Sequence, residues 1–319
     1  MTKLINSQCS NVTIGIPFYN EEKYIGEAIR SAAIQCGAVW ISDNASTDDS
    51  AGVCESMSPE YPNVSYVRQH KNQGAVFNFK FVLDKATTPY FMWLGGHDIL
   101  PHGYVQNLMK LYENNPEAVL VYGASQHIDV NGEFVSHYDY FYSSQIADES
   151  PSVRLLGLIR YLGDCSLIHG IFRTDDLRAA WDEYGSLVYR SADHVLLGHA
   201  ALKGRFIYDP KTSLIRRDVH PVDTAVDQLK RMGVQTSNEE QLSHRMMQVK
   251  LYSQAINVSE NSGLNGMMYR IRARFYLVMH FGPFGKTKTA RKFEELIFLI
   301  QRFRRMAKGI LHRVMALMR

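Results

Sequence analysis

The segment Tyr90–Leu100, YFMWLGGHDIL, joins an apolar stretch directly to a turn that carries an imidazole and a carboxylate, His97 and Asp98. Polar side chains just after a buried strand are typical of ligand sites, because the loops that leave the carboxyl ends of parallel strands enclose a crevice. The adjacent Gly95 and Gly96 would let the backbone approach a bulky group closely. The alternative is a turn whose His97 and Asp98 only cap the next helix.

Two earlier apolar segments also end in residues that suit a nucleotide. The first, VTIGIPF, is followed by an aromatic ring at Tyr19 and a carboxylate at Glu21. The second, AVWIS, is followed directly by Asp43, whose carboxylate could accept hydrogen bonds from a nucleobase or a ribose. For each segment alone, turn chemistry and helix capping are the simpler interpretation.

The elements that must position these residues alternate along the chain. Apolar segments predict strands near 12–18, 38–43, 64–67 and 90–94, and helical patterns follow from about residues 22, 48, 74 and 101. This alternation is typical of βαβ units with a parallel sheet. Segments 118–125 and 134–142 are joined through Asn131-Gly132, a dipeptide that favours a tight hairpin, so we expect an antiparallel portion as well.

The second half of this region continues the α/β pattern. We predict helices from about residues 152 and 175 and over 192–204, and strands over 167–172, 205–210 and 212–217. The sequence therefore predicts a catalytic domain over residues 1–220, a helical extension over 221–267 and a basic amphipathic segment over 268–319.

The charge is distributed unevenly. The chain of 319 residues has a formal charge of +3, but residues 268–319 hold thirteen Lys and Arg against two acidic residues, or +11, which leaves −8 for the rest. Apolar residues recur every three or four positions in the tail, while Arg302, Arg305, Lys308 and Arg313 lie largely off this stripe. This pattern is typical of a helix in an anionic membrane interface. The alternative is a stripe that packs on the catalytic domain or on a second copy of the chain, as in a homo-oligomer.

Other classes of protein are disfavoured. Basic residues interleaved with Phe, Leu and Ile do not form the open polar face expected for nucleic acid. The N-terminus lacks the apolar core of a signal peptide and no stretch is long enough to span a membrane, so we expect a cytoplasmic protein that is peripheral at the inner face of the membrane. Four dispersed cysteines, Cys9, Cys36, Cys54 and Cys165, indicate reduced structural thiols.

Four motifs in sequence carry a family resemblance. I-P-F-Y-N-E-E, I-S-D-N-A-S-T-D-D-S, H-K-N-Q-G and W-L-G-G-H-D-I-L, in this order and spacing, resemble the family 2 glycosyltransferases of the GT-A fold, over roughly residues 11–220. The resemblance implies an inverting enzyme that moves a sugar from a nucleotide-sugar donor to a hydroxyl of a glycan or lipid-linked acceptor. We expect the donor to be a UDP-sugar.

The resemblance also implies roles for single residues. It places the nucleotide of the donor among Pro17, Tyr19, Glu21, Asp43, Asn72, Gly74 and Gly96, with Arg216 and Arg217 over the diphosphate. Asp193, in S-A-D-H, matches the family's catalytic base, although Ala192 replaces the usual Glu. The alternative is that Asp193 is only an acidic residue favoured at a helix start, where the dipole would lower its basicity.

The chain departs from the family at its metal motif. Members usually carry an Asp-rich D-x-D or D-D where this chain has Gly95-Gly96-His97-Asp98, so His97 takes the usual metal-ligand position. Imidazole suits Mn²⁺ better than Mg²⁺, which prefers oxygen. Three interpretations follow: a metal, Mn²⁺ rather than Mg²⁺, held by His97 and completed by His220; a metal held through Asp98; or no metal, with basic side chains neutralising the diphosphate.

Two rival functions remain open from the sequence. The loss of the Asp-rich motif is also typical of a degenerate, membrane-associated protein that binds a nucleotide-sugar without catalysis. A nucleotidyltransferase shares the nucleotide-binding sheet but typically has a Gly-rich basic loop after its first strand, where this chain has the acidic and aromatic F-Y-N-E-E.

Overall fold

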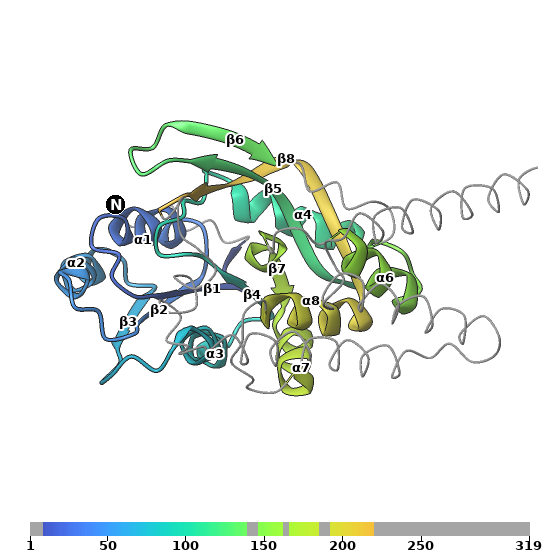
Figure 1. Ribbon diagram of the computed structural model, residues 1–319, viewed down its shortest axis with the longest axis horizontal. Helices are drawn as coiled ribbons and strands as arrows, with labels where there is room; N and C mark the ends of the chain where they lie inside the picture. Colours follow the sequence, from blue (N-terminus) through green and yellow to red (C-terminus); the bar gives the residue numbers. More distant parts are fainter. Residues whose placement is uncertain (1–8, 139–145, 162–165, 185–191, 220–319) are drawn as a thin grey trace, which may run out of the picture.

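The computed structural model describes residues 9–138, 146–161, 166–184 and 192–219 (Figure 1). The strands are β1 (Val12–Phe18), β2 (Ala38–Asp43), β3 (Val64–Arg68), β4 (Tyr90–Trp93), β5 (Ala118–Ile128), β6 (Phe134–Tyr138), β7 (Ile171–Arg173) and β8 (Arg205–Arg217). The helices are α1 (Ile25–Ala33), α2 (Ser50–Met57), α3 (Ala75–Lys85), α4 (Tyr104–Asn114), α6 (Pro151–Tyr161), α7 (Thr174–Tyr184) and α8 (Ala192–Lys203), with short 3-10 turns η2 (Ser58–Glu60) and η3 (Ser166–His169).

One mixed sheet organises these elements. The strand order is β3-β2-β1-β4-β7-β5-β6, and β8 pairs with β5. β3, β2, β1 and β4 run parallel, as does β8 with β5, whereas β7 is antiparallel to both of its neighbours and β6 is antiparallel to β5. The α/β class, the largely parallel sheet and its antiparallel portion are therefore confirmed.

Helices cover both faces of the sheet and divide the core in two. Residues of α1, α2 and α4 pack with one set of strand side chains, and residues of α3, α6, α7 and α8 pack with the other (Figure 1). Trp93, which is fully buried, anchors the second core, with Phe91 and Trp181 ring centroids 5.0 and 5.9 Å from its own. The end of β4 is therefore a rigid base for the turn that follows it.

Two predicted boundaries differ from the structure. The predicted strand 167–172 is mostly the turn η3, and only Ile171–Arg173 pairs with its neighbours. The predicted strands 205–210 and 212–217 are one strand, β8, whose register with β5 shifts after Gly123. A β-carbon at Gly123 would lie 2.1 Å from the Thr212 carbonyl oxygen, so the irregularity needs glycine. A bulge of this kind lets one strand continue past a pairing fault.

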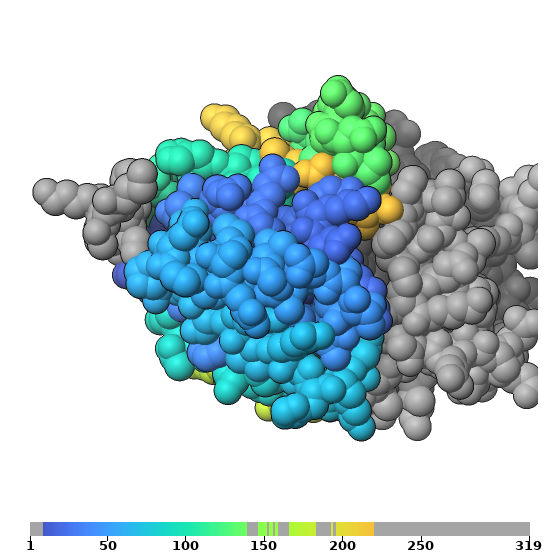
Figure 2. Space-filling model, turned by 90° about the vertical axis from the view of Figure 1, so that its left-hand side faces the viewer, coloured from blue at the N-terminus to red at the C-terminus, as the bar shows by residue number. Residues whose placement is uncertain are grey.

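The predicted hairpin is confirmed. Gly132 adopts φ +89° in the turn between β5 and β6, a conformation that glycine adopts without steric cost. Figure 2 shows the green residues of this hairpin directly above the blue N-terminal part of the chain. Phe134, Val135 and Tyr138 of β6 are exposed.

Several sequence expectations concern other parts of the chain. The helical extension 221–267, the basic segment 268–319 and His220 lie outside the described residues. Among the helices that are described, none is long and apolar enough to cross a membrane.

Three of the four cysteines lie in the described residues. Cys9, Cys36 and Cys54 are buried free thiols, and burial raises the pKa of Cys36 and of Cys54 to about 12. A thiol with so high a pKa carries almost no thiolate, the reactive form, at neutral pH.

Candidate active site

Three parallel strands end side by side and define one edge of the sheet as the candidate site. β1 pairs with β2 so that Phe18 lies opposite Asp43, and the amide of Leu94, just after β4, donates to the Gly15 carbonyl at 3.0 Å. The turns after β1, β2 and β4 therefore leave from the same edge. Pro17 is buried within β1, whereas Tyr19 is exposed beyond its end.

Asp43 is a fully buried carboxylate that is held from two sides. It accepts the Ser46 amide at 2.7 Å and the Tyr66 hydroxyl at 3.1 Å, and the Arg68 Nε lies 3.6 Å from Oδ2. Burial and the neighbouring carboxylate raise the pKa of Tyr66, which keeps its proton for this bond. Two accepted bonds and one ion pair leave further lone-pair positions on Asp43, but its side chain is fully covered, so a ligand reaches it only when the surrounding turns shift.

The N-x-G turn is tied to the end of β2. The Asn44 side-chain amide donates to the Asn72 side-chain oxygen at 2.9 Å, and that oxygen also accepts the Gly74 amide at 2.9 Å. In return, Asn44 accepts the Gln73 amide at 2.9 Å. Gly74 adopts φ +84° where the turn enters α3. The structure thus brings Asn72 and Gly74 beside Asp43, although they follow it by about thirty positions.

The turn after β4 depends on two glycines. A β-carbon at Gly96 would lie 2.8 Å from that of Phe18 and 3.1 Å from Cγ of Glu21, so this residue packs directly against the end of β1. A β-carbon at Gly95 would lie 2.7 Å from Oδ2 of Asp98. The carboxylate of Asp98 therefore occupies the space that a side chain at position 95 would need.

His97 is paired with a carboxylate from the turn after β1. Its Nδ1 lies 2.7 Å from Oε1 of Glu21, and its side chain is 28% exposed. Burial alone would lower the pKa of His97, but the bond to Glu21 and the negative charge of Asp98 raise it above its ordinary value. The resemblance implies a contact of Glu21 with the base or ribose, and in this structure its carboxylate is bonded to the imidazole of His97.

Asp98 is buried and charged. Its Oδ1 accepts the backbone amide of Arg217 at 3.1 Å and lies 4.0 Å from Nε2 of His97. Burial would raise the pKa of Asp98, but the positive charges of His97, His169 and Arg216 lower it below its ordinary value. The ionised carboxylate is thus stabilised by basic groups that surround the turn.

The two adjacent arginines have different surroundings, because successive side chains of a strand point to opposite faces. The charge of Arg216 lies close enough to His97, Asp98 and His169 to shift the pKa of each, and its guanidinium donates to the Ser166 hydroxyl. Arg216 is therefore suitably placed for a diphosphate beside this turn.

Arg217, in contrast, is 7% exposed and faces the protein interior. Its guanidinium donates to Glu27 at 2.8 Å and to the carbonyl oxygens of His97 and Asp129 at 3.4 and 3.3 Å, and it lies over the ring of Tyr24 at 4.7 Å. Through these contacts the Arg217 guanidinium holds the backbone of the turn that carries His97. The resemblance implies instead that this guanidinium contacts the diphosphate.

Asp193 is partly buried in the first turn of α8. β8 begins beside Ala118, at the start of β5, so the end of α8 at Lys203 lies at the edge opposite the candidate site. Leu196 and Leu197, about one turn after Asp193, are buried in the same core as Trp93. The start of α8 and the end of β4 therefore share a core.

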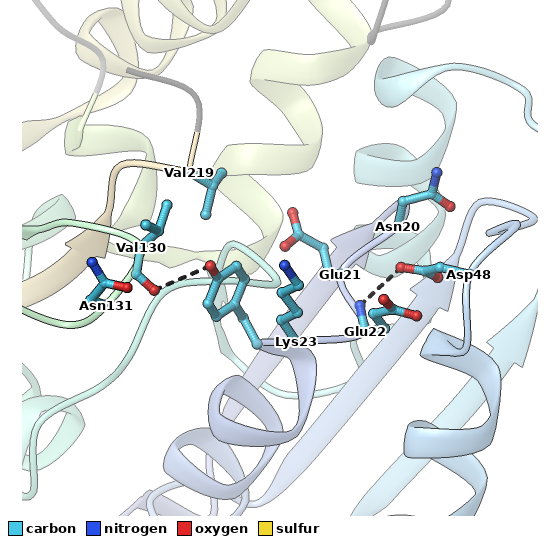
Figure 3. Close-up of a pocket in the computed structure, with 9 residues that line it drawn as sticks. Asn20, Glu21, Glu22, Lys23, Asp48, Val130, Asn131 and Val219 are labelled. Carbon is cyan, nitrogen blue, oxygen red and sulfur yellow. Dashed lines mark hydrogen bonds between the residues drawn. The ribbon is translucent and has the colours of Figure 1, made fainter. Parts of the chain in front are cut away.

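A cavity of about 570 Å³ lies beside these turns. The turn after β1, the loop before α2, the hairpin and the segment after β8 line it, with Asn20, Glu21, Glu22, Lys23, Tyr24, Asp48, Val130, Asn131 and Val219 at its walls (Figure 3). The Tyr24 hydroxyl donates to the Val130 carbonyl at 3.3 Å, and the Glu22 amide donates to Asp48 at 3.0 Å. Glu21 thus belongs both to a cavity wall and to the pair with His97.

A model of one protein family, Glycosyl transferase family 2, matches residues 13–172, which is half of the chain. The chain belongs to glycosyl transferase family 2. This is a family of inverting enzymes that use nucleotide-sugars. The match contains the turns after β1, β2 and β4 and ends before α8, so it covers Tyr19, Asp43 and His97 but neither Asp193 nor the two arginines.

Curated relatives of this family 2 chain are distant and longer. An uncharacterised glycosyltransferase of Rickettsia bellii is 27% identical over 163 residues, which are 50% of this chain and 22% of the relative. A chondroitin synthase of Escherichia coli is 28% identical over 129 residues, 40% of this chain and 19% of the relative. The matched part is therefore about a fifth of the length of these relatives.

Solved structures share the fold. The S. aureus TarS fragment 1–349 in complex with UDP-GlcNAc has a TM-score of 0.61 at 17% identity, over 86% of this chain and 73% of that one. A mannosyltransferase of Pyrobaculum calidifontis in complex with GDP-Man and Mn²⁺ has a TM-score of 0.52 at 15% identity, over 85% and 70%. At such identities the likeness shows the GT-A fold alone.

The turn after β4 offers two possible metal ligands, so an ion there would need most of its ligands from the diphosphate and from water. The described part of the chain holds no group of three or more His, Cys, Asp and Glu arranged to bind a metal. Two donor atoms, His97 Nε2 and Asp98 Oδ1, lie 4.0 Å apart. Both are within reach of one ion with bonds of about 2.0–2.6 Å, if diphosphate and water supply the remaining ligands.

Reasoning from sequence missed several residues of the site. Tyr66 and Arg68 of β3 contact Asp43, and Asn44 holds the Asn72 turn. The short apolar segment 64–67 predicted a strand but not which side chains of that strand reach the next one. Asn44 directly follows Asp43 at a strand end, and that position was a usable signal.

Proposed function

We propose that this protein transfers a sugar, with inversion, from a nucleotide-sugar donor to a hydroxyl of a glycan or lipid-linked acceptor. The single observation that carries the proposal is that the turns after β1, β2 and β4, which bear Tyr19, Asp43 and His97, leave one sheet edge within the family 2 region. Ligands of open α/β sheets bind at this edge.

The donor we propose is a UDP-sugar. Tyr19 is exposed at the end of β1 and offers a ring against which a planar base can stack. Asp43 can accept a hydrogen bond from an N–H of the base, with Asn72 and Gly74 completing that wall. The TarS structure in complex with UDP-GlcNAc supports a uridine nucleotide in this fold.

The diphosphate lies, in this proposal, beside the turn that carries His97 and Asp98. Arg216 neutralises part of its charge, because guanidinium groups bind phosphate oxygens strongly. A divalent cation held by His97 and Asp98 would supply Lewis-acid stabilisation of the departing diphosphate when bound. The nitrogen ligand favours Mn²⁺ over Mg²⁺. His220, outside the described residues, remains a candidate further ligand.

Asp193 is the proposed general base, which takes the proton of the acceptor hydroxyl as that oxygen attacks the anomeric carbon. The position of Asp193 at the start of α8, which shares its core with the end of β4, supports this role. We infer also that the basic segment 268–319 binds the anionic inner face of the cell membrane and brings a lipid-linked acceptor to the site.

Two measurements on the full chain test the transferase. Binding of UDP is measured by calorimetry, and release of UDP from a UDP-sugar is followed with and without Mn²⁺. Asp193→Asn should retain UDP affinity and lose roughly 10²–10⁴-fold in turnover. Asp176→Asn is the matched control, because Asp176 is a partly buried acid in the first turn of α7 and should keep full turnover.

The outcomes separate the proposal from its rival. The replacement of the Asp-rich motif by Gly95-Gly96-His97 favours one alternative, a degenerate nucleotide-sugar-binding protein. UDP binding without turnover under every condition would establish that alternative. Absence of UDP binding would refute both, and unchanged turnover in Asp193→Asn would refute the assignment of the base.

The membrane role is tested separately. We expect the protein to sediment with vesicles that contain anionic lipid, to release in high salt, and to bind less when Arg302 and Arg305 are changed to Glu. Equal sedimentation of both proteins would contradict the proposal and would favour packing of this segment on the catalytic domain or on a second copy.

A further inference from the structure

The pair formed by Glu21 and His97 has a chemical consequence for any ligand of the imidazole. A neutral imidazole carries one N–H and one lone pair, and the hydrogen bond made by one nitrogen decides which nitrogen keeps the lone pair. With Nδ1 only 2.7 Å from a carboxylate oxygen, which can only accept, the proton belongs on Nδ1. In the neutral ring, the form that can bind a metal, the lone pair then belongs on Nε2.

The free nitrogen is on the side of the ring where a second donor lies. Nε2 of His97 is 4.0 Å from Oδ1 of Asp98, on the turn that the proposed function assigns to the diphosphate. Histidine ligands of metals typically donate their other N–H to a carboxylate, which fixes the ring and raises the basicity of the ligating nitrogen. The arrangement of Glu21, His97 and Asp98 has this form.

We infer that Glu21 is a positioning residue that holds His97 in the Nδ1–H tautomer, so that Nε2 and Asp98 together bind Mn²⁺ with the donor diphosphate. This inference rests on the proposed function, because it needs a nucleoside diphosphate at the turn after β4. It replaces the role suggested by the resemblance, in which Glu21 contacts the base or ribose. It also explains how this chain can bind a metal without the Asp-rich motif.

The local packing supports a fixed rather than a chance contact. Gly96 lets the turn approach Glu21 so closely that its missing β-carbon would be 3.1 Å from Cγ of Glu21. The backbone of Glu21 is itself held, because its amide donates to the Ser50 hydroxyl at 2.9 Å. Arg217 holds the other side of the turn through the His97 carbonyl. Both partners of the pair are therefore anchored independently.

The first experiment measures Mn²⁺ affinity of the full chain with saturating UDP, from the electron paramagnetic resonance signal of free Mn²⁺. We expect Glu21→Ala to weaken Mn²⁺ binding by about 10–100-fold, the usual effect of removing such an outer carboxylate. Glu21→Gln should lose less, because its amide oxygen still accepts from Nδ1. The control is Glu22→Gln, the same change one residue on at the same cavity wall, which should bind Mn²⁺ as the wild type does.

A double substitution separates positioning from general damage. His97→Asp supplies an oxygen ligand in place of the imidazole, so we expect its metal preference to shift toward Mg²⁺. Because no imidazole is left to position, adding Glu21→Ala to His97→Asp should cause no further loss of Mn²⁺ affinity. The same loss in both backgrounds would overturn the inference, since it would mean that Glu21 acts without His97.

The tautomer itself is observable. Nitrogen-15 spectra of labelled histidine, recorded above the raised pKa of His97 and with its signals assigned by their absence in His97→Ala, should show Nδ1–H in the wild type and a shift toward Nε2–H in Glu21→Ala. Equal Mn²⁺ affinity of wild type and Glu21→Ala would refute the role of Glu21 alone. A wild-type complex that binds UDP but no Mn²⁺ would instead refute the metal in the proposed function, and with it this inference.

Discussion

Arg217 provides the sharpest test of how the site is supported, because the sequence and the structure suggest different roles for it. As a diphosphate ligand it would affect donor binding and little else. As the buried partner of Glu27 and of the His97 and Asp129 carbonyls, it should affect stability first. The informative change is Arg217→Met, which keeps an apolar stem of similar length and removes the guanidinium.

The expected loss of stability is about 1.5–4 kcal/mol. The pair with Glu27 contributes less than about 1 kcal/mol, since Glu27 is 50% exposed and water screens the charge. The two carbonyl bonds are long, at 3.4 and 3.3 Å, and together contribute about 1–2 kcal/mol. The contact with the Tyr24 ring adds about 0.5–1 kcal/mol. The backbone bond from residue 217 to Asp98 survives the substitution.

Urea denaturation of the full chain measures this loss, and calorimetry with UDP measures the donor site in the folded protein. Arg217→Met should unfold at a lower urea concentration than the wild type. Its affinity for UDP, measured without metal, should fall by less than about threefold. Glu27→Gln, which removes only the exposed partner, should cost under about 1 kcal/mol. Full stability combined with a large loss of UDP affinity would refute this reasoning and return Arg217 to the diphosphate.

Three further changes have effects that the structure makes specific. Gly15→Ala would place a β-carbon 2.6 Å from Cγ2 of Val82 in the core, so we expect a loss of about 1–3 kcal/mol by calorimetric melting. Asp43→Asn should cost about 1–3 kcal/mol, because its amide cannot replace both oxygens that hold Tyr66 and the Ser46 amide, and should also weaken UDP binding. Burial would raise the pKa of Asp48, but its hydrogen bonds with the Ser50 hydroxyl and nearby amides lower it further. The stability it contributes is present above about pH 4 and is lost as the pH falls through its folded pKa, so Asp48→Asn should flatten the acid limb of a pH–stability curve.

The parallel half of the sheet was predictable because each of its strands is a short apolar run followed by a helical pattern. VTIGIPF and YFMWL are buried on both faces, as strands in the middle of a sheet must be, and continuous apolar runs are the signature of that position. The candidate site at the carboxyl ends of the strands followed from the same pattern, since Asp43 directly follows the run AVWIS and His97 lies three residues after YFMWL.

The antiparallel half was harder to predict for a physical reason. β7 has three residues and lies between β4 and β5, so its pairing depends on neighbours that are far away in sequence rather than on its own pattern. β8 contains Pro210, which cannot donate to a ladder and is the last residue of the first of the two strands predicted there. The register of β8 with β5 shifts after Gly123, so the residues around Pro210 are left out of the pairing and the strand continues beyond them.

The altered metal motif shows that the residues of one segment are not enough to predict which side chains surround a site. Read along the chain, Gly95-Gly96-His97-Asp98 keeps only one carboxylate, that of Asp98, where the family has an Asp-rich motif, and this change predicts either a degenerate site or a softer metal. In space, a second carboxylate lies beside His97, because Glu21 comes from the turn after β1, 76 positions earlier, and Gly96 is small enough to admit it. Gly96 and His97, which stand where the family has its Asp-rich motif, are thus the two residues that allow Glu21 to contact this turn: Gly96 leaves room for its side chain, and His97 forms the hydrogen bond with it. In the arrangement that we infer, Glu21 compensates for the altered motif, so substitutions at Gly96, His97 and Glu21 should be coupled rather than additive.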